Sequence, residues 1–579
     1  MAVLVLITGT VVGVWHFSRP PLSPQSSSLN PEAAPAALPL PDKPSIVVLP
    51  FVNMSKDPDQ EYFSDGLTET LTGDLSKISS LFVIARNSAF TYKGKAVKVQ
   101  DVGREMGVRY VREGSVLKAG DQVRITAQLI EASSGYHLWT QRYDRPLQDI
   151  LRLHDEIGQK IVTTLKLQIT LQEQGYIVRK HTDNLEAYDA FLRGMEYWGR
   201  FTKEGYAQAR QMFEKALALD PQYAEPYAWL SRIYWVEWVE RSNVDPQPLE
   251  RALALAQQAL TLDDSLPVAH SRLGMVYALK QQYDQAIAEG ERAIALDPNN
   301  ADSYAFQAEV LYWAGRPEEA LRMVAQAMRL NPRYPSLYLF FLGVAYNATG
   351  RHTEAVATLQ EVLSRNPNKF GAHVVLALSY VQQWASQQSA DSQTLAQASA
   401  AAQRAIALSD PSFQGHVVLG MVYLWQKQYD QALAEMERAI ALDPNEAETY
   451  AALAETLSRV GRPKEAVGRA EQALGRKPLI ADWHLYGVGA AYYLAGQPVE
   501  AVAPLKQYLT RYPNILGAHL TLAAVYSELG RETEARAEAA EVLRINPQFS
   551  LEVHKQRAPI KDMAMLGRHL AALRKAGLK

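Results

Sequence analysis

The sequence contains no cysteine among its 579 residues. This absence excludes disulfide bonds, thiol catalysis, iron–sulfur clusters and cysteine-ligated zinc. Neither sign of charge dominates, because 59 lysine and arginine residues stand against 62 aspartate and glutamate residues. Coating a phosphate backbone depends on clustered lysine and arginine, so this balance argues against a nucleic-acid coat protein. Apolar residues make up 47% of the chain, which is too much for a chain that is disordered throughout.

Short sequence signatures of common enzymes are also missing. The chain has no GxxxxGK(S/T) phosphate-binding loop, no HExxH metal motif and no GxSxG between a strand and a helix. No nucleophile is paired with an evident base. We therefore expect a protein without catalytic residues, without a cofactor and without a metal site.

The first residues form the longest uncharged run. Residues 2–17, AVLVLITGTVVGVWHF, carry no charge, and as a helix they reach roughly 24 Å, somewhat less than the ~30 Å hydrocarbon core of a bilayer. Trp15 stands where an interfacial aromatic residue is expected. A secretory signal needs basic residues before the apolar run, and none precede it. We predict that residues 1–17 are a transmembrane anchor. A poorly formed or uncleaved signal peptide remains the alternative, and both place the rest of the chain outside the cytosol.

A linker and a small domain follow. Proline, serine and alanine dominate residues 18–44, which predicts a semi-extended spacer without a core. Residues 45–180 read as a small α/β domain, in which two turn signals, Gly120-Asp121 and Ser134-Gly135, separate alternating segments and predict an antiparallel meander. The expected strands are Ser45–Phe51, Leu81–Ala85, Val108–Leu117, Val123–Ala132 and Tyr136–Tyr143, and the expected helices are Glu61–Ile78, Val97–Met106 and Ile150–Leu171.

Four stretches of this domain match a known family. They are VVLPFVNMSKDPDQEYFSDGLTE, VIARNSAFTYKGK, VGREMGVRYVREGSV and RITAQLIEASSGYHLWTQRYDR. Together they cover nearly all of residues 45–165 and resemble a TolB-type amino-terminal domain. In that family the domain follows a transmembrane helix and precedes tetratricopeptide repeats. The same tail is often fused behind a class III adenylate cyclase domain or behind the winged-helix domain of membrane-anchored transcription regulators. Only 44 residues precede Ser45, so this chain contains neither of those heads.

Residues 181–550 repeat themselves about every 34 positions. A representative unit has Leu273-Gly274, then Ala286 and Ala293, and closes with Pro298. Small residues let two helices approach closely, and proline ends the second helix because it has no N–H and restricts the residue before it. The pattern resembles the tetratricopeptide repeat, whose helix–turn–helix units stack into a superhelix, and we count ten units. The closing prolines are at positions 298, 332, 367, 411, 444, 478, 513 and 547.

A longer repeat lies over the short one. Residues of the segment 230–367 recur 146 positions later in the segment 376–513. Both segments carry an insertion between the helices of their first unit, at Val239–Leu249 and at Ala385–Leu395. We call the two segments the first block and the second block, and we interpret them as a duplicated group of four repeats. Residues 551–579 leave the pattern and are predicted to form a capping helix, because a solenoid must cover its last apolar face.

Four histidines, at positions 270, 373, 416 and 519, share the fourth position of their repeats. A ladder of metal ligands is conceivable, but helix packing is the favoured interpretation. The first helix of each repeat lines the concave face, and an aromatic, apolar stripe there suits an extended peptide or a partner helix. Many of these residues also suit ordinary packing between repeats. The predicted groove residues are Trp235, Met275, Tyr312, Trp313, Phe340, Asn347, Met421, Leu424, Trp425, Tyr486 and Tyr493.

The sequence thus predicts an α+β chain: a transmembrane segment, a TolB-like α/β domain and an all-α tetratricopeptide solenoid. The primary hypothesis is a non-catalytic scaffold in a bacterial inner membrane that binds protein or peptide partners from the periplasmic side and binds no nucleic acid. The alternative is the sensory tail of an adenylate cyclase-type or winged-helix signalling protein whose output domain is absent from this chain.

Overall fold

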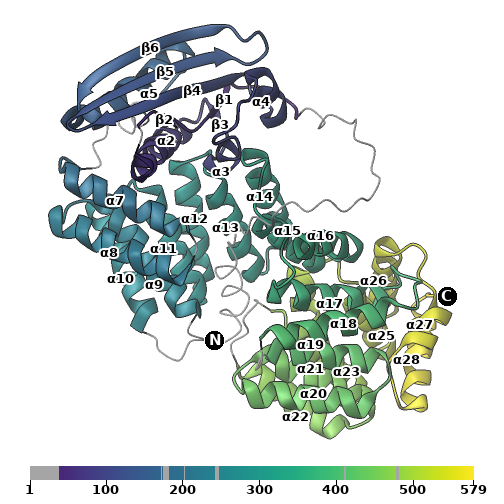
Figure 1. Cartoon of the computed structure of the whole chain (residues 1–579). Helices are drawn as coiled ribbons and strands as arrows, with labels where there is room; N and C mark the ends of the chain where they lie inside the picture. The colour runs from purple at the N-terminus through teal and green to yellow at the C-terminus, as the bar shows by residue number, and fades with distance from the viewer. Residues whose placement is uncertain are drawn as a thin grey trace.

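The computed structural model describes residues 38–55, 57–170, 173, 182–200, 202–240, 247–409, 413–476 and 482–579. The predicted anchor and residues 18–37 of the predicted linker lie outside the described residues. Within the described ranges, no helix combines the length and the apolar character that crossing a membrane requires. Figure 1 shows a sheet domain beside the first helices, followed by a winding array that ends at the helices α27 and α28.

The α/β domain is built on a mixed sheet. Its main strands lie in the order β3 (Phe82–Val83), β1 (Ser45–Val48), β4 (Tyr110–Ala119), β5 (Gln122–Glu131) and β6 (His137–Pro146). Strand β1 is parallel to both β3 and β4, whereas β4, β5 and β6 form an antiparallel meander, so the prediction of a meander is confirmed.

The first predicted strand is divided in the structure. Strand β1 ends at Val48, and a separate strand β2 (Val52–Asn53) also pairs in parallel with β4. Between them, the backbone N–H of Phe51 donates a hydrogen bond to the Thr68 hydroxyl, at 3.0 Å. Pro50, which has no N–H to donate to the sheet, lies in the same interruption, and together these two features explain why the predicted Ser45–Phe51 strand is not continuous.

Helices α2 (Glu61–Ser76) and α5 (Ile150–Thr164) contribute the core of one sheet face. The apolar stripe of α2, which includes Leu67, Leu71 and Leu75, is fully buried, as its four-residue spacing predicts. The prediction that the last helix extends to Leu171 is wrong. Helix α5 ends at Thr164, and Lys166 adopts a φ of 50°, a left-handed conformation that an α-helix cannot continue through.

The helical array that follows the α/β domain consists of helix pairs. In several pairs, a glycine on the first helix lies against the second helix; a Cβ atom on Gly343 would lie 2.8 Å from the Leu359 side chain. Ten pairs occur among the described residues: α7 (Leu185–Trp198) with α8 (Lys203–Leu219), α9 (Ala224–Glu240) with α10 (Gln247–Leu262), α11 (Pro267–Leu279) with α12 (Tyr283–Leu296), α13 (Ala301–Trp313) with α14 (Pro317–Leu330), α15 (Ser336–Ala348) with α16 (His352–Arg365), α17 (Phe370–Ala385) with α18 (Thr394–Leu408), α19 (Phe413–Trp425) with α20 (Tyr429–Leu442), α21 (Ala447–Val460) with α22 (Pro463–Leu474), α23 (Leu485–Leu494) with α24 (Pro498–Arg511), and α25 (Leu516–Glu528) with α26 (Glu532–Ile545).

The C-terminal region contains two helices, so the prediction of one capping helix over 551–579 is wrong. Helix α27 (Leu551–Arg557) stops before Pro559, and helix α28 (Met563–Lys575) starts after Asp562. Asp562 accepts hydrogen bonds from the backbone N–H groups of the first turn of α28 and so acts as its N-cap. Both helices contribute to the hydrophobic core formed with α25. The cap is therefore a bent pair.

The α/β domain packs directly on the first block. The amide of Asn299, in the turn after α12, donates to the carbonyl oxygens of Ser76 and Ile78 and accepts from the backbone N–H of Val83. The next helix pair makes a similar contact: the backbone N–H of Ala85, in the sheet domain, donates to the carbonyl of Leu330, at the end of α14, at 2.8 Å. Since these contacts are buried, the sheet domain and the array form one continuous body over this region.

Candidate functional site

The structure separates the eleven predicted groove residues into two groups. Seven are buried in helix packing, and one of these seven, Tyr493, also lines the cavity described next. The other four are only partly buried. The buried residues are Trp235, Met275, Trp313, Phe340, Asn347, Leu424 and Tyr493, and the partly buried ones are Tyr312, Met421, Trp425 and Tyr486.

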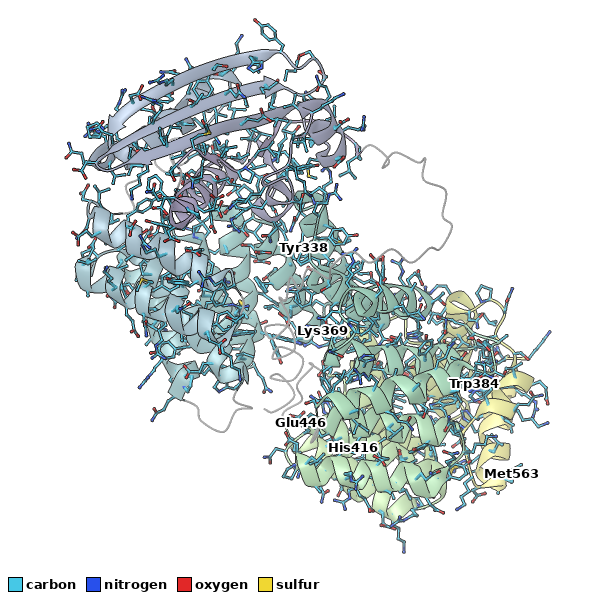
Figure 2. The ribbon with its side chains drawn as sticks, in the orientation of Figure 1. Tyr338, Lys369, Trp384, His416, Glu446 and Met563 are labelled. Carbon is cyan, nitrogen blue, oxygen red and sulfur yellow. The ribbon has the colours of Figure 1, made fainter. Side chains whose placement is uncertain are left out.

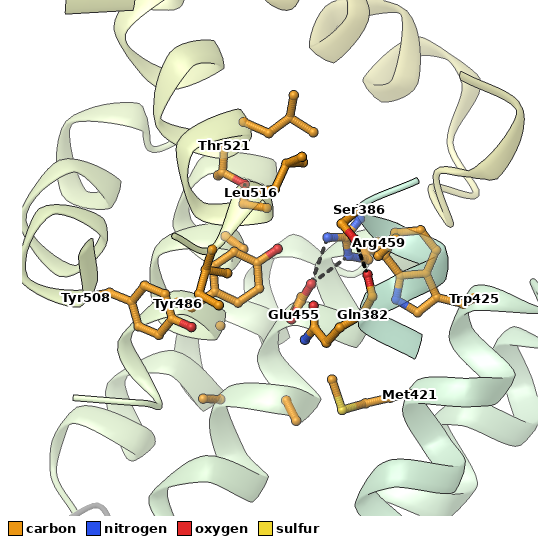
Figure 3. A pocket seen from close by; sticks show the side chains of 18 of the residues that line it. Gln382, Ser386, Met421, Trp425, Glu455, Arg459, Tyr486, Tyr508, Leu516 and Thr521 are labelled. Carbon is orange, nitrogen blue, oxygen red and sulfur yellow. Dashed lines mark hydrogen bonds and ion pairs between the residues drawn. The ribbon is translucent and has the colours of Figure 1, made fainter. Parts of the chain in front are cut away.

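Three of the partly buried residues meet in one cavity, which we call the C-terminal cavity (Figure 3). Its volume is about 190 Å³, and Met421, Trp425 and Tyr486 lie on its wall. Tyr312 is not among its lining residues. The wall is formed by the first helices of five successive pairs, α17, α19, α21, α23 and α25, together with residues of α27 and α28. Part of the predicted stripe thus lines a cavity in the second half of the array.

One ion pair lies in the wall of this cavity. The Arg459 guanidinium donates from Nε and Nη2 to the same oxygen of Glu455, at 3.0 and 2.7 Å, one helical turn away on α21 (Figure 3). Burial lowers the pKa of Arg459, but Glu455 and Tyr486 outweigh this effect and leave the pKa raised. Burial also raises the pKa of Tyr486 to about 12. The arginine is therefore charged and the phenol protonated at neutral pH.

Four histidines line the same cavity, and burial lowers the pKa of each. For His352 and His554 the pKa falls to about 4, so both are uncharged at neutral pH. His554 and His569 come from the two C-terminal helices, and their Nε2 atoms lie 3.1 Å apart. His484 is 7% exposed, and its Nδ1 atom has no hydrogen-bond partner among the described residues.

The C-terminal segment contributes His554, Ile560 and His569 to the wall of the cavity, and residues just before it also bind the insertion of the second block. Gln387 and Ser550 exchange two hydrogen bonds, and Asn546 donates to the Ser386 carbonyl at 2.9 Å. Arg557 stacks on Trp384, which Figure 2 labels beside these helices, with its guanidinium carbon 3.7 Å from the ring centre. The insertion predicted from the repeat pattern thus serves as the receiving surface for the cap.

The two blocks differ at the positions that shape the cavity. Three positions of the second block that line the cavity hold alanine or glycine, and the matching positions 146 residues earlier hold large side chains that pack into the core. Replacing large residues by small ones leaves space that neighbouring helices do not fill. The pairs are Phe306 and Ala452, Phe341 and Gly487, and Val344 and Ala490.

The same helices also differ in their charged residues. Glu309 is the first-block counterpart of Glu455, but Trp313 occupies the place of Arg459. Burial raises the pKa of Glu309 to about 8, and its Oε1 atom has no hydrogen-bond partner among the described residues. The first block therefore keeps a buried neutral acid where the second block keeps an ion pair.

The histidines at the fourth repeat position act in packing. The Nδ1 atoms of His270 and His519 lie 2.6 Å from a glutamate on the following helix. The Nε2 atoms of His373 and His519 lie 2.9 Å from the carbonyl of the preceding closing proline. Across the described ranges, no group of three or more possible ligands is arranged to hold a metal ion.

Sequence reasoning missed the residues that give the cavity its shape and charge. Glu455 and Arg459 look like an ordinary exposed pair four residues apart on a helix, yet their side chains are 13% and 11% exposed. The small residues at 452, 487 and 490 look like ordinary repeat positions. A position-by-position comparison of the two blocks could have found them, because only the second block has small side chains at all three.

Several family models match the helical array. Models described as tetratricopeptide repeat match residues 249–301, 280–339, 311–379, 413–478, 451–515 and 516–549. Among solved structures, a thermophilic TPR protein of Thermus thermophilus is 25% identical, with 34% of this chain and 98% of that chain covered and a TM-score of 0.30. A tetratricopeptide repeat protein of Parabacteroides merdae is 14% identical, with 47% and 100% covered and a TM-score of 0.33.

Relatives of known sequence extend the comparison. A Rhizobium meliloti protein named "Putative adenylate cyclase 3" is 41% identical over 276 residues, which cover 48% of this chain and 46% of that protein. The Salmonella typhimurium transcriptional regulator HilA is 21% identical over 314 residues, which cover 54% and 55% of the two chains. The chain thus spans about half the length of these relatives. Within the helical part, residues 249–379 and 413–549 match models of the tetratricopeptide repeat, which agrees with the stacked helix pairs found there.

Proposed function

We propose that the protein is a non-catalytic scaffold that holds a protein or peptide partner in its second block. Tetratricopeptide arrays suit this role because their stacked first helices leave a concave surface for another polypeptide. The observation that carries the proposal is the contrast between the blocks. The second block has an aromatic-lined cavity where the first block fills the matching positions with phenylalanine and valine.

The test fills the cavity of the full chain with the first block's own residue. Ala452→Phe installs the side chain found at Phe306, and Ala434→Phe adds the same ring at an exposed position on α20 as the control. Partners are crosslinked to the chain in solubilised membranes and identified by mass spectrometry. We expect partners that Ala434→Phe retains and Ala452→Phe loses. If both variants retain the same partners, the cavity is not the binding site.

We further propose that residues 1–17 anchor the protein in a bacterial inner membrane and that residues 45–180 form a TolB-like domain on the periplasmic side. The uncharged run at 2–17 supports the first part, and the four matching stretches within 45–165 support the second. A C-terminal alkaline phosphatase fusion, which is active only outside the cytosol, tests the orientation. An inactive fusion of normal abundance would contradict it.

A second candidate function is the sensory tail of a signalling protein. The 41% identity to the adenylate cyclase-named protein supports it, because the match covers only 46% of that protein. The DNA immediately upstream of the Met1 codon separates the two candidates. An in-frame cyclase or winged-helix segment favours the tail, and an independent ribosome-binding site favours the scaffold.

A further inference from the structure

The C-terminal cavity is small. Its wall contains His554 and Ile560, and the backbone N–H of Lys561 donates to the carbonyl of Arg459 at 2.9 Å. A volume of about 190 Å³ is too small for a stretch of extended peptide, so a peptide occupies the cavity by inserting a side chain. A cavity of ~150 Å³ holds one benzene molecule. The volume of about 190 Å³ therefore matches one phenol or indole ring.

The charges inside the cavity favour an uncharged guest. Arg459 is neutralised by Glu455, and the four lining histidines are uncharged at neutral pH. A charged group that enters must leave water without a counter-ion of its own, which is costly. Glu448 also lines the cavity, but its side chain is already engaged with Glu446 and is not a free counter-ion.

The walls also offer specific contacts to an aromatic ring. Trp425, Tyr486 and Tyr508 present aromatic rings, and Met421 presents a thioether, which is a favourable neighbour for aromatic groups. The Nδ1 atom of His484 is buried and has no hydrogen-bond partner among the described residues. A buried polar atom of this kind is satisfied by a guest with an N–H or O–H group. Both indole and phenol carry such a group.

We propose that the C-terminal cavity anchors the partner through one tryptophan or tyrosine side chain inserted from outside. This inference rests on the proposed scaffold function and adds the chemistry of the anchor. Insertion of one aromatic residue into a desolvated pocket is the usual form of an interface hot spot. The concave surface around the cavity then provides shape complementarity to the rest of the partner.

The experiment measures binding of small probes to the full chain by calorimetry. The probes are N-acetyl-tryptophanamide, N-acetyl-tyrosinamide, N-acetyl-aspartamide and N-acetyl-lysinamide. We expect the two aromatic amides to bind and the two charged amides to bind at least ~10-fold more weakly. Ala452→Phe should weaken the aromatic amides at least ~10-fold, and the exposed Ala434→Phe should change them less than ~2-fold. Equal binding of charged and aromatic amides would overturn the proposal.

A second variant covers the case in which Ala452→Phe fails to fold. Ala490→Val installs the residue found at Val344 in the first block and fills less of the cavity than phenylalanine does. It should weaken binding of the aromatic amides by about threefold, or ~0.6 kcal/mol. An unchanged affinity in a folded Ala490→Val protein would contradict the assignment of the cavity.

A displayed peptide library separates this inference from the proposed function. Selected peptides that share a tryptophan or tyrosine and lose binding to Ala452→Phe support both. Peptides that bind in an Ala452-dependent manner without any aromatic residue overturn the anchor and leave the scaffold intact. If free indole binds the wild-type chain and not Ala452→Phe, but no peptide that contains tryptophan does so, the cavity binds a small molecule and both proposals fail.

Discussion

The first and second blocks share a repeat pattern, but each is completed by a different part of the chain. Asn299 of the first block is 2% exposed and holds the sheet domain, whereas its counterpart Asn445 is exposed. The second block instead receives residues 546–557 on its insertion. Two segments with the same repeat pattern thus differ in their side chains, and these side chains determine what covers each segment and whether a cavity remains.

The largest effect is expected at the contact between the sheet domain and the first block. Asn299→Ala removes three hydrogen bonds and leaves buried backbone groups unsatisfied, which should cost ~3 kcal/mol of unfolding free energy. Asn445→Ala should stay within ~0.5 kcal/mol because that residue is exposed. Urea unfolding of the two variants measures the difference. Equal losses would mean that the two blocks are not distinguished by this contact.

The second prediction concerns the matched acids. Glu455→Gln leaves Arg459 buried without its charged partner, which should cost ~2 kcal/mol of unfolding free energy. Glu309→Gln should cost less than ~0.5 kcal/mol at pH 6, because Glu309 is already neutral there. Urea unfolding at pH 6 measures both changes.

The pH dependence of Glu309 provides a further check. Its pKa is raised from 4.5 to about 8, so its contribution to stability is complete below pH 4.5 and is lost as the pH rises through 8. The Glu309→Gln variant lacks this loss, so its stability relative to the wild type should increase between pH 6 and pH 8.5. A constant difference over that range would contradict the raised pKa.

The third prediction compares the two blocks under acid. Burial lowers the pKa of His554 from 6.5 to about 4 and that of His569 further, and the nearby charge of Arg459 acts in the same direction on both. The unfolded state therefore binds protons first as the pH falls below 6.5. The free energy of unfolding the segment formed by α27 and α28 should therefore fall by ~2 kcal/mol between pH 7 and pH 5.

Hydrogen exchange at pH 7 and pH 5, corrected for intrinsic rates, measures this effect in α27 and α28. The control is α11 of the first block. Burial lowers the pKa of His270, but Glu289 and the Asp264 carbonyl outweigh it and leave the pKa raised, so acid should not loosen that helix. Equal loosening of α11 and the cap would show that acid acts on the whole array.

The smallest effect is expected at the repeated histidines. The ring of His519 hydrogen-bonds to both Glu538 and the Pro513 carbonyl, whereas among the described residues the ring of His373, at the matching position, hydrogen-bonds to the Pro367 carbonyl alone. His519→Ala should therefore cost ~1 kcal/mol more than His373→Ala, as measured by thermal unfolding. If His373→Ala costs as much, the glutamate contact contributes nothing.

The repeat pattern was readable because it depends on local rules. Glycine and alanine at helix contacts and proline after each second helix are set by backbone packing, so they recur in phase and predict the helix pairs. Pro50 was a local sign of the break in the first strand, because it has no N–H for a sheet hydrogen bond, but the hydrogen bond from Phe51 to Thr68 was not readable, because it depends on how helix α2 packs. The same limit applies to the cavity. Whether Glu455 is an exposed or an enclosed acid depends on how far the array curls, and single repeats do not carry that information.

The closure of the second block has a consequence for how the protein matures. The residues that complete the cavity, 546–561, lie about 160 positions after their contacts at Ser386 and Gln387. On the ribosome, the walls from α17, α19 and α21 emerge before the segment that completes them, and contacts of such long sequence separation form late. For that interval the aromatic lining is more exposed to water, and a nascent chain stalled before residue 546 presents to chaperones more of this surface than the finished molecule does.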